Sequence, residues 1–293
     1  MQQSLHQLVS RNVSRTMFVV CTLFTVTILG ILALVTGYLI SIGSKNLSVP
    51  LLTETFSGDY QKPGGLAHGL VGTGVLIFIA SLAGIPFGML CGIYLSEYDT
   101  GSWLVTPVRF VCDVLAGVPS IVVGILGYEL LVRPIGNYNG WAGAMALAFI
   151  MVPIVARTTE EMLRLVPNSY REASTALGAT KSHTIMKVVL PAATGSVITG
   201  IMLAIARVAG ETAPLLFTAL LGGYIPITFG GDFPWVHFAM DQPFPSLTVQ
   251  IFKYANRPEE SVRSLAWGGI LVLIALIFVL NLAIRFSTRQ RKA

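Results

Sequence analysis

The sequence predicts an all-α, polytopic membrane protein with six transmembrane helices, and three observations support this fold class. Charged residues make up 11% of the chain, against ~25% in an ordinary soluble domain. The mean hydropathy is +0.73 and 54% of the residues are apolar. Apolar stretches of about 20 residues, the length of a membrane-spanning helix, recur along the chain. A soluble chain of this composition could not cover its surface with polar groups.

Six apolar segments are long enough to cross the ~30 Å core of a bilayer as helices. They lie at 17–42, 70–94, 105–132, 141–162, 192–221 and 265–286. Gly117, Val118 and Pro119 interrupt the third segment, because glycine and proline weaken a helix. Arg11 and Arg15 before the first segment are also compatible with a signal peptide. That segment is too long, however, and no small-residue cleavage site follows it, so we expect it to stay as a helix.

Lysine and arginine set the orientation, because cytoplasmic loops carry an excess of both. With the N-terminus inside, twelve fall in inner segments and six in outer segments, and Arg207 lies within a span. The inner residues are Arg11, Arg15, Arg109, Arg157, Arg164, Arg171, Lys181, Lys187, Arg285, Arg289, Arg291 and Lys292; the outer residues are Lys45, Lys62, Arg133, Lys253, Arg257 and Arg263. We therefore expect both termini to be cytoplasmic.

This topology divides the chain into a cytoplasmic N-terminal segment at 1–16, a six-helix transmembrane domain at 17–288 and a cytoplasmic tail at 289–293. It also places three outer loops, at about 43–69, 133–140 and 222–264, and one long cytoplasmic loop at about 168–191.

Several other classes of protein are disfavoured. The net charge of +5 would suit nucleic-acid binding, but the basic residues flank apolar segments, which membrane topology explains better. Cys21, Cys91 and Cys112 are isolated in apolar runs and show neither metal-ligand spacing nor a disulfide framework. The histidines form no ligand cluster, and we find no nucleophile–base constellation. We expect no nucleic-acid partner, no metal site and no enzymatic activity.

The cytoplasmic loop reads REASTALGATKSHTIMKVVLP at 171–191. Pro167 ends the preceding helix, and Ser169 with Glu172 forms a capping box that predicts a new short helix. That helix is expected to end at Gly178, which suits the left-handed C-cap position.

Thr180 or Ser182 can cap a second short helix, and Leu190 with Pro191 is expected to turn the chain back into the membrane. Exposed Ala173, Ala176 and Gly178 would let another backbone approach closely. A well-capped connector with a solvated charged face is the simpler alternative. Lys181 and Ser182 match the end of a phosphate-binding loop, but Thr175 and Thr180 stand where that loop requires glycine. We therefore expect no ATP site in this chain.

Glu172-Ala173-Ser174, then Gly178, then Val188-Val189-Leu190-Pro191, resembles the EAA loop of ABC importer permeases in every spacing. Ser174 replaces the second alanine of that pattern and Val188 its isoleucine. The resemblance implies the type I, MetI-like permease fold, in which this loop is a coupling helix that docks on a separate ATPase. The ATPase-coupling residues it implies are Glu172, Ala173, Gly178, Leu190 and Pro191.

Longer stretches resemble one branch of these permeases, the PstA family of phosphate importers. They are VPSIVVGILGY (118–128), VPIVARTTEEMLRLVP (152–167), IARVAGETAPLLFTAL (205–220) and PSLTVQIFKYA (245–255). The resemblance implies inorganic phosphate as cargo and a bacterial plasma (inner) membrane. It also implies a second permease subunit (PstC-like), two ATPase subunits (PstB-like) that bind ATP and Mg, and an extracytoplasmic phosphate-binding protein (PstS-like). Sulfate or molybdate remains an alternative cargo.

Ionisable residues inside a span are costly and indicate function. Arg207 and Glu211 are four residues apart, so we expect them to share one helix face and to form an ion pair toward the bundle interior. The pair could fix helix packing. Alternatively, Arg207 could bind phosphate through its bidentate fork, with Glu211 as a competitor and Thr212 as a hydroxyl donor. Proton coupling through Glu211 would instead make the chain a stand-alone secondary transporter.

A second charged group, Arg157 with Glu160 and Glu161, closes the fourth segment. Arg157 can pair with either acid, and anchoring at the membrane interface by snorkelling is the alternative to a pathway role. The resemblance to PstA favours the pathway, because that family places basic residues in both of these helices. The predicted substrate-pathway residues are Arg157, Glu160, Arg207, Glu211 and Thr212. Asp113, expected to be solvated, and Glu129 are weaker candidates.

Overall fold

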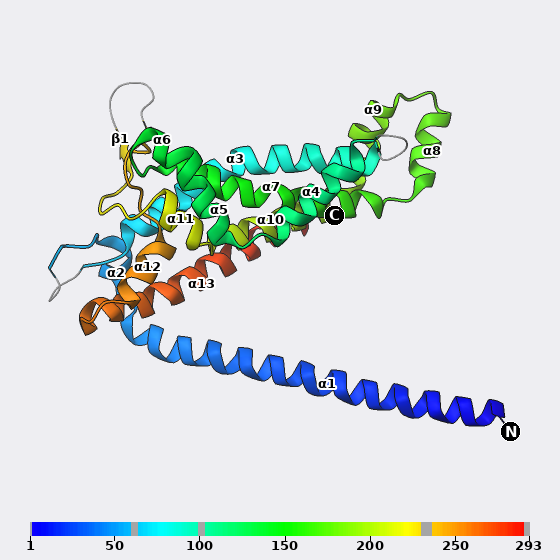
Figure 1. Ribbon diagram of the computed structural model, residues 1–293, viewed down its shortest axis with the longest axis horizontal. Helices are drawn as coiled ribbons and strands as arrows, with labels where there is room; N and C mark the ends of the chain where they lie inside the picture. Colours follow the sequence, from blue (N-terminus) through cyan, green and yellow to red (C-terminus); the bar gives the residue numbers. More distant parts are fainter. Residues whose placement is uncertain (1, 60–63, 99–102, 230–235, 290–293) are drawn as a thin grey trace.

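The computed structural model describes residues 2–59, 64–98, 103–229 and 236–289 as an elongated bundle of helices (Figure 1). The long helices are α1 (Gln2–Gly43), α3 (Ala67–Glu97), α7 (Gly140–Arg164), α10 (Leu190–Ala209) and α13 (Glu260–Arg289). Five helices in the described ranges are long and apolar enough to cross a membrane. The bent third segment supplies a sixth span if its two halves are counted together.

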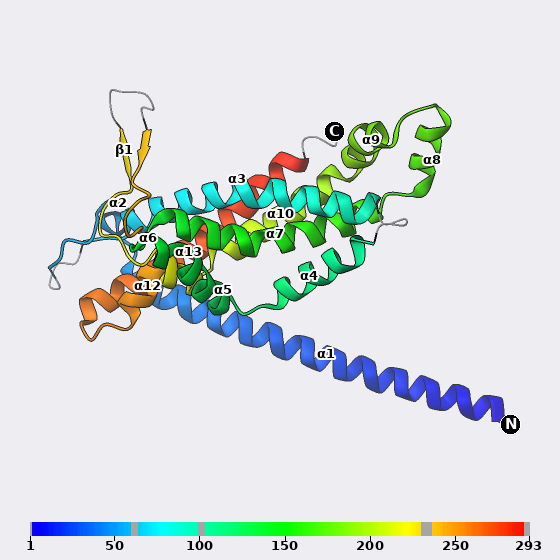
Figure 2. The ribbon, with the colours of Figure 1, turned by 45° about the horizontal axis from the view of Figure 1, so that its top comes forward.

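The third segment is broken as the sequence predicts. Helix α4 (Val105–Gly117) and helix α5 (Ser120–Gly127) meet at 101°, and Figure 2 shows α4 leaving the bundle at this elbow. Val118 and Pro119 between them are extended, with ψ angles of 131° and 133°. Proline restricts the residue before it to extended conformations, which stops α4 at this point.

The connections gather at the two ends of the bundle (Figure 1). One end holds α2 (Val49–Thr53), α6 (Arg133–Ile135), α12 (Leu247–Ala255) and the hairpin of β1 (Ile227–Phe229) and β2 (Val236–Phe238). The strands are antiparallel, with Thr228 opposite His237. The opposite end holds α8 (Asn168–Ala176), α9 (Lys181–Thr184) and the start of α1. The three predicted outer loops thus share one end, and its assignment to the outside stays a prediction.

Helices α3 and α7 pack almost backbone to backbone. A Cβ atom added to Gly88 would lie 2.7 Å from the Cβ of Val155, and one added to Gly92 would lie 2.5 Å from the carbonyl oxygen of Ala156. Because Gly88 and Gly92 are four residues apart, they lie on the same face of α3 and leave it free of side chains where α7 packs. The two helices consequently pack in close contact, and buried Met151 and Leu147 of α7 belong to the core that surrounds this contact.

Helix α1 diverges from the bundle toward its N-terminus, as both views show (Figure 2). It meets α13 only near its C-terminal end, where Gly43 faces Leu271. The large apolar side chains from Met17 to Val35 are exposed. In a bilayer this surface faces lipid or another membrane protein. The predicted segment at 1–16 is helical from Gln2 onward and continuous with the first span. Of the predicted tail, 290–293 lie outside the described residues.

The fifth segment differs from the prediction at its outer end. The single helix expected at 192–221 ends at Ala209, and a short helix α11 (Ala213–Thr218) follows. Gly210 stands at the C-cap of α10. Pro214 has no N–H to donate to the preceding turn, and its ring would clash with a carbonyl there, so the helix cannot continue.

The same segment also differs at its inner end, where the predicted turn at Leu190 and Pro191 is wrong. Helix α9 continues through a π-helical stretch (Ile185–Val189) into α10, and the three form one apolar span from Lys181 to Ala209. A π-helical turn widens the ring of backbone hydrogen bonds. We attribute the smooth passage of Pro191 to this widening, because proline cannot supply the usual bond to the fourth residue before it.

Candidate functional site

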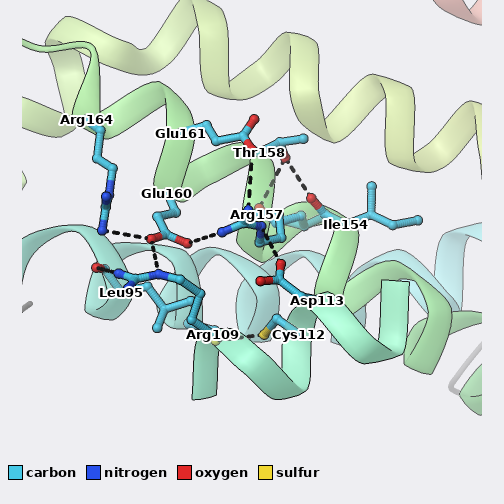
Figure 3. Close-up of polar contacts among 12 residues, drawn as sticks. Leu95, Arg109, Cys112, Asp113, Ile154, Arg157, Thr158, Glu160, Glu161 and Arg164 are labelled. Atoms are coloured by element: carbon cyan, nitrogen blue, oxygen red, sulfur yellow. Dashed lines mark hydrogen bonds and ion pairs between the residues drawn. The ribbon is translucent and has the colours of Figure 1, made fainter. Parts of the chain in front are cut away.

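Glu160 of α7 is the centre of an ion-pair network that we call the Glu160 cluster (Figure 3). Its side chain is only 2% exposed. Arg109 of α4 donates from Nε to Oε1 at 2.9 Å, Arg157 donates from Nη1 to Oε2 at 3.1 Å, and Arg164 pairs with Oε1 at 3.0 Å. Positions 157, 160 and 164 lie on one face of α7 by helical spacing. One buried carboxylate thus holds three arginines.

Two further acids complete the Glu160 cluster through Arg157. Its Nε atom lies 2.9 Å from Oδ1 of Asp113 on α4, and its Nη2 atom lies 3.9 Å from Oε1 of Glu161. Asp113, with a side chain 49% exposed, is therefore paired as well as solvated. Three arginines face three acids, so the Glu160 cluster is nearly neutral and joins α4 to α7.

Glu129, the other weaker candidate, lies elsewhere. It pairs with Arg133 at 2.6 Å in an exposed contact near the end that holds α6. Arg109 and Arg164, by contrast, belong to the Glu160 cluster, and neither is among the predicted site residues. The spacing of Arg164 from Glu160 is a usable signal. Nothing local in the sequence of α4 links Arg109 to α7.

Arg207 and Glu211 pair less closely than predicted. The distance from Nε of Arg207 to Oε1 of Glu211 is 4.0 Å, and Glu211 lies beyond the end of α10 rather than on its face. The side chain of Arg207 is 57% exposed and that of Glu211 15%. The hydroxyl of Thr248 on α12 donates to the backbone carbonyl of Glu211 at 3.0 Å and holds this bend in place. Thr212, half-buried, follows at the N-cap of α11.

A small cavity lies beside Arg207 and Glu211. Arg207 and Glu211 line it together with Ala116 of α4, Ser120 of α5 and Ile154 of α7. Ile154 is three residues before Arg157, and Ala116 is three residues after Asp113. Arg207 and Glu211 therefore lie at the α4–α5 elbow, and the residues that line their cavity on α4 and α7 are within one helical turn of Asp113 and Arg157.

The cytoplasmic loop, which we call the coupling loop (168–191), projects beyond the bundle at α8 and α9 (Figure 1). Glu172, Ala173 and Ala176 are exposed, and Leu177 is 89% exposed. Tyr170, Leu177, His183 and other loop residues line a hollow of about 690 Å³ between the two short helices. Exposed Tyr170 and Leu177 line this hollow together, and a contiguous exposed apolar surface is typical of a site that binds another protein.

The helix signals of the coupling loop are only partly confirmed. Gly178 has a φ of +81°, as the left-handed cap requires, and Thr180 accepts from the backbone N–H of His183 at 3.3 Å. The capping box is wrong: α8 begins at Asn168, and Pro167 at its N-cap makes no side-chain bond. Proline at the N-cap fixes the start two residues earlier than predicted, so Ser169 lies inside the helix.

Comparisons with known proteins agree with this architecture. The family model "Binding-protein-dependent transport system inner membrane component" matches residues 84–292. The phosphate transport system permease protein PstA of Yersinia pestis is 42% identical over 250 residues, which cover 85% of this chain and 81% of that protein. PstA of Haemophilus influenzae is 39% identical over 254 residues, 87% of this chain and 86% of that protein.

Among solved structures, the MetNI methionine ABC transporter in inward-facing conformations matches with a TM-score of 0.63 at 18% identity. The match covers 77% of this chain and 95% of that chain. It shows a shared fold and confirms the predicted MetI-like permease fold. The chain therefore belongs to the binding-protein-dependent transport system inner membrane component family and, within it, to the PstA phosphate transport system permease proteins.

Proposed function

We propose that this chain is the transmembrane permease subunit of an ATP-driven ABC importer for inorganic phosphate in a bacterial plasma membrane. The observation that carries the proposal is its identity of about 40% to PstA proteins over most of both chains. The chain forms half of the pathway and performs no catalytic step. A PstC-like second permease forms the other half, two PstB-like subunits bind ATP and Mg, and a PstS-like protein delivers phosphate from outside.

Phosphate moves along the arginines because each of them is already partly neutralised. A guanidinium holds phosphate through a bidentate fork, but a pathway must also release what it binds. The guanidinium of Arg207 is more exposed than that of Arg157 and lies 4.0 Å from Glu211, so it is more available to bind phosphate. Arg157 is shared among Asp113, Glu160 and Glu161, so phosphate competes there with three carboxylates and is held only briefly.

ATP drives the transition between outward-open and inward-open states through the coupling loop. The exposed face of α8, with Glu172 and Ala173, docks on the ATPase, and Gly178 lets the two backbones approach closely. Closure of the two ATPases around ATP pulls on 168–190. The orientation predicted from lysine and arginine, with both termini and this loop in the cytoplasm, is required for this coupling.

The test is to purify the chain with its three partners and to measure ATP hydrolysis while the anion on the binding protein is varied. We expect phosphate to stimulate hydrolysis severalfold and sulfate or molybdate to leave it at the basal rate. Equal stimulation by sulfate would assign another oxyanion. Phosphate transport by the chain alone in liposomes under a proton gradient would show a secondary transporter and contradict the proposal.

A further inference from the structure

We infer that Arg171 and Glu97 form the mechanical link that carries movement of the coupling loop into the transmembrane helices, which makes them positioning residues for transport. The inference rests on the proposed function, because it gives the ATP-driven movement of α8 a route into the bundle. Arg171 precedes Glu172 on α8, and Glu97 is the last residue of α3.

Arg171 uses its guanidinium fully. Its Nε atom donates to Oε2 of Glu97 at 3.0 Å and its Nη2 atom to Oε1 at 2.7 Å, a bidentate pair. Nη1 donates to the carbonyl of Val166 at 2.7 Å and to Oδ1 of Asn168 at 3.4 Å, and Nη2 donates to the carbonyl of Leu163 at 3.0 Å. These contacts match the five N–H donors of the group. One side chain thus joins the end of α3, the end of α7 and the start of α8.

The pair is sheltered from solvent. The side chain of Glu97 is 5% exposed and that of Arg171 22%. Shielded charge pairs are screened less by salt than surface pairs, and the planar fork fixes their geometry as well as their distance. Glu97 accepts these hydrogen bonds, and they raise the pKa of the Arg171 guanidinium. By contrast, the Arg133–Glu129 pair is exposed on both sides.

A second contact joins the coupling loop to the same end of α3. The Nζ atom of Lys181 lies 4.2 Å from the centre of the Tyr98 ring, within the range of a cation–π interaction. Within the loop, the hydroxyls of Ser174 on α8 and Thr184 on α9 share a 2.8 Å hydrogen bond. Both short helices are therefore attached to the end of α3, and they are attached to each other.

The C-terminal end of α3 can transmit a displacement of α8 into the bundle. Helices α3 and α7 are locked together where Gly88 and Gly92 contact α7 directly. Close-packed interiors transmit displacement rather than absorb it. Leu163, whose carbonyl Arg171 binds, is three residues after Glu160. A displacement of α8 consequently reaches the Glu160 cluster within one helical turn.

The link lies on the opposite face of α8 from the docking surface. Arg171 and buried Ser174 face the bundle, whereas Glu172, Ala173 and Ala176 face outward. Changes to Glu97 and Arg171 therefore separate transmission from docking. We would compare Glu97→Ala, Glu97→Gln and Arg171→Lys in the complete four-component complex in proteoliposomes, with Arg133→Ala at the opposite end as the matched control.

For the Glu97 variants we expect ATPase association and ATP hydrolysis to remain near wild type. Phosphate taken up per ATP should fall by roughly threefold to thirtyfold, the range of coupling effects along such networks. Arg171→Lys keeps the charge but loses the fork, so its loss should be smaller. The inference would be overturned if the Glu97 variants lost ATPase association. It would also be overturned if hydrolysis and uptake fell equally, or if uptake per ATP did not change.

A chemical cross-link tests the mechanical role directly and guards against a folding defect. Glu97→Cys with Arg171→Cys is built in a chain whose Cys21, Cys91 and Cys112 are replaced by serine, and is joined by a short bifunctional thiosulfonate reagent. We expect uncoupled transport before the reaction and recovered uptake per ATP after it, with no recovery in either single-cysteine chain. Failure of the cross-linked chain to recover would contradict the link.

A readout that needs no cargo separates this inference from the proposed function. Spin labels at Thr175→Cys on α8 and Leu82→Cys on α3, both exposed sites, report the distance between the two helices. We expect this distance to be the same with ATP and with ADP-vanadate, and to differ between those states once Glu97→Ala is added. A complex that fails to transport phosphate yet keeps this pattern would refute the proposed cargo and retain the link. A distance that changes in the unmodified pair would refute the link.

Discussion

Arg109 on α4 and Glu160 on α7 are 51 residues apart in sequence and are joined by a 2.9 Å hydrogen bond from Nε to Oε1. Glu160 also pairs with Arg157 and Arg164, so a single shielded carboxylate contacts three arginines from two helices. Removing one partner of a buried pair leaves charge uncompensated and is strongly destabilising. The contact thus couples the stability of the fold to the state of the proposed pathway.

Glu160→Gln should destabilise the assembled complex and reduce phosphate uptake. The arginines keep 26–47% of their side-chain surface exposed, so we expect a cost of about 1–3 kcal/mol rather than the ~3–5 kcal/mol of a fully buried pair. The melting temperature of the complex measures the cost. Glu161→Gln is the matched control, since Glu161 is exposed and 3.9 Å from Arg157. Equal melting temperatures for both variants would refute the central role of Glu160.

Arg207→Ala should abolish phosphate uptake while the complex still assembles. The side chain is more than half exposed and its acid is 4.0 Å away, so little packing or pairing is lost. Size-exclusion chromatography checks assembly, and radiolabelled phosphate measures uptake. Arg133→Ala, which removes an exposed arginine from its pair with Glu129, should transport normally. Full uptake by the Arg207 variant would remove it from the pathway.

Gly178→Val should weaken association with the ATPase. A left-handed φ of +81° strains a β-branched residue by about 1–2 kcal/mol, and the new side chain stands on the docking surface. Gly136→Val imposes the same strain at a φ of +79° near the other end, with open space around it. A pull-down should therefore show reduced ATPase binding only for the Gly178 variant. Equal binding in both would contradict the docking role.

Gly88→Leu should prevent stable packing of α3 on α7. A Cβ atom at Gly88 already approaches Val155 to 2.7 Å, so a larger side chain must push the helices apart. Overpacking of this kind costs about 1–3 kcal/mol or more. Gly74→Leu on the same helix is the control, because nothing lies within 4 Å of an added Cβ there. The yield of monodisperse protein in detergent should fall for the first variant alone.

Local sequence signals predicted the elements whose causes are local. The spans follow from apolar length, the elbow of α4 and α5 from Pro119, and the end of α8 from Gly178. The errors arose where tertiary contacts or competing local geometry decided the outcome. The helix start at Asn168 follows from Pro167, so Ser169 lies in the first turn of α8 and the helix has no side-chain N-cap.

The site shows the same division. The pairing of Arg157 with both neighbouring acids follows from helical spacing and is present in the structure. The contribution of Arg109 depends on how α4 leans on α7, and no periodicity in either helix encodes it. Glu211 shares no helix face with Arg207 because α10 ends at Gly210, between the two residues. Pro214, which follows Glu211, prevents the helix from continuing.

The most direct test of the account is ATP-dependent phosphate accumulation by the complete complex in proteoliposomes that enclose ATP and Mg, with the phosphate-loaded binding protein outside. We expect phosphate uptake that requires ATP and is lost with Arg207→Ala, and we expect no uptake of sulfate or molybdate. Uptake that proceeds without the ATPase subunits, driven by a proton gradient across liposomes containing this chain alone, would contradict it.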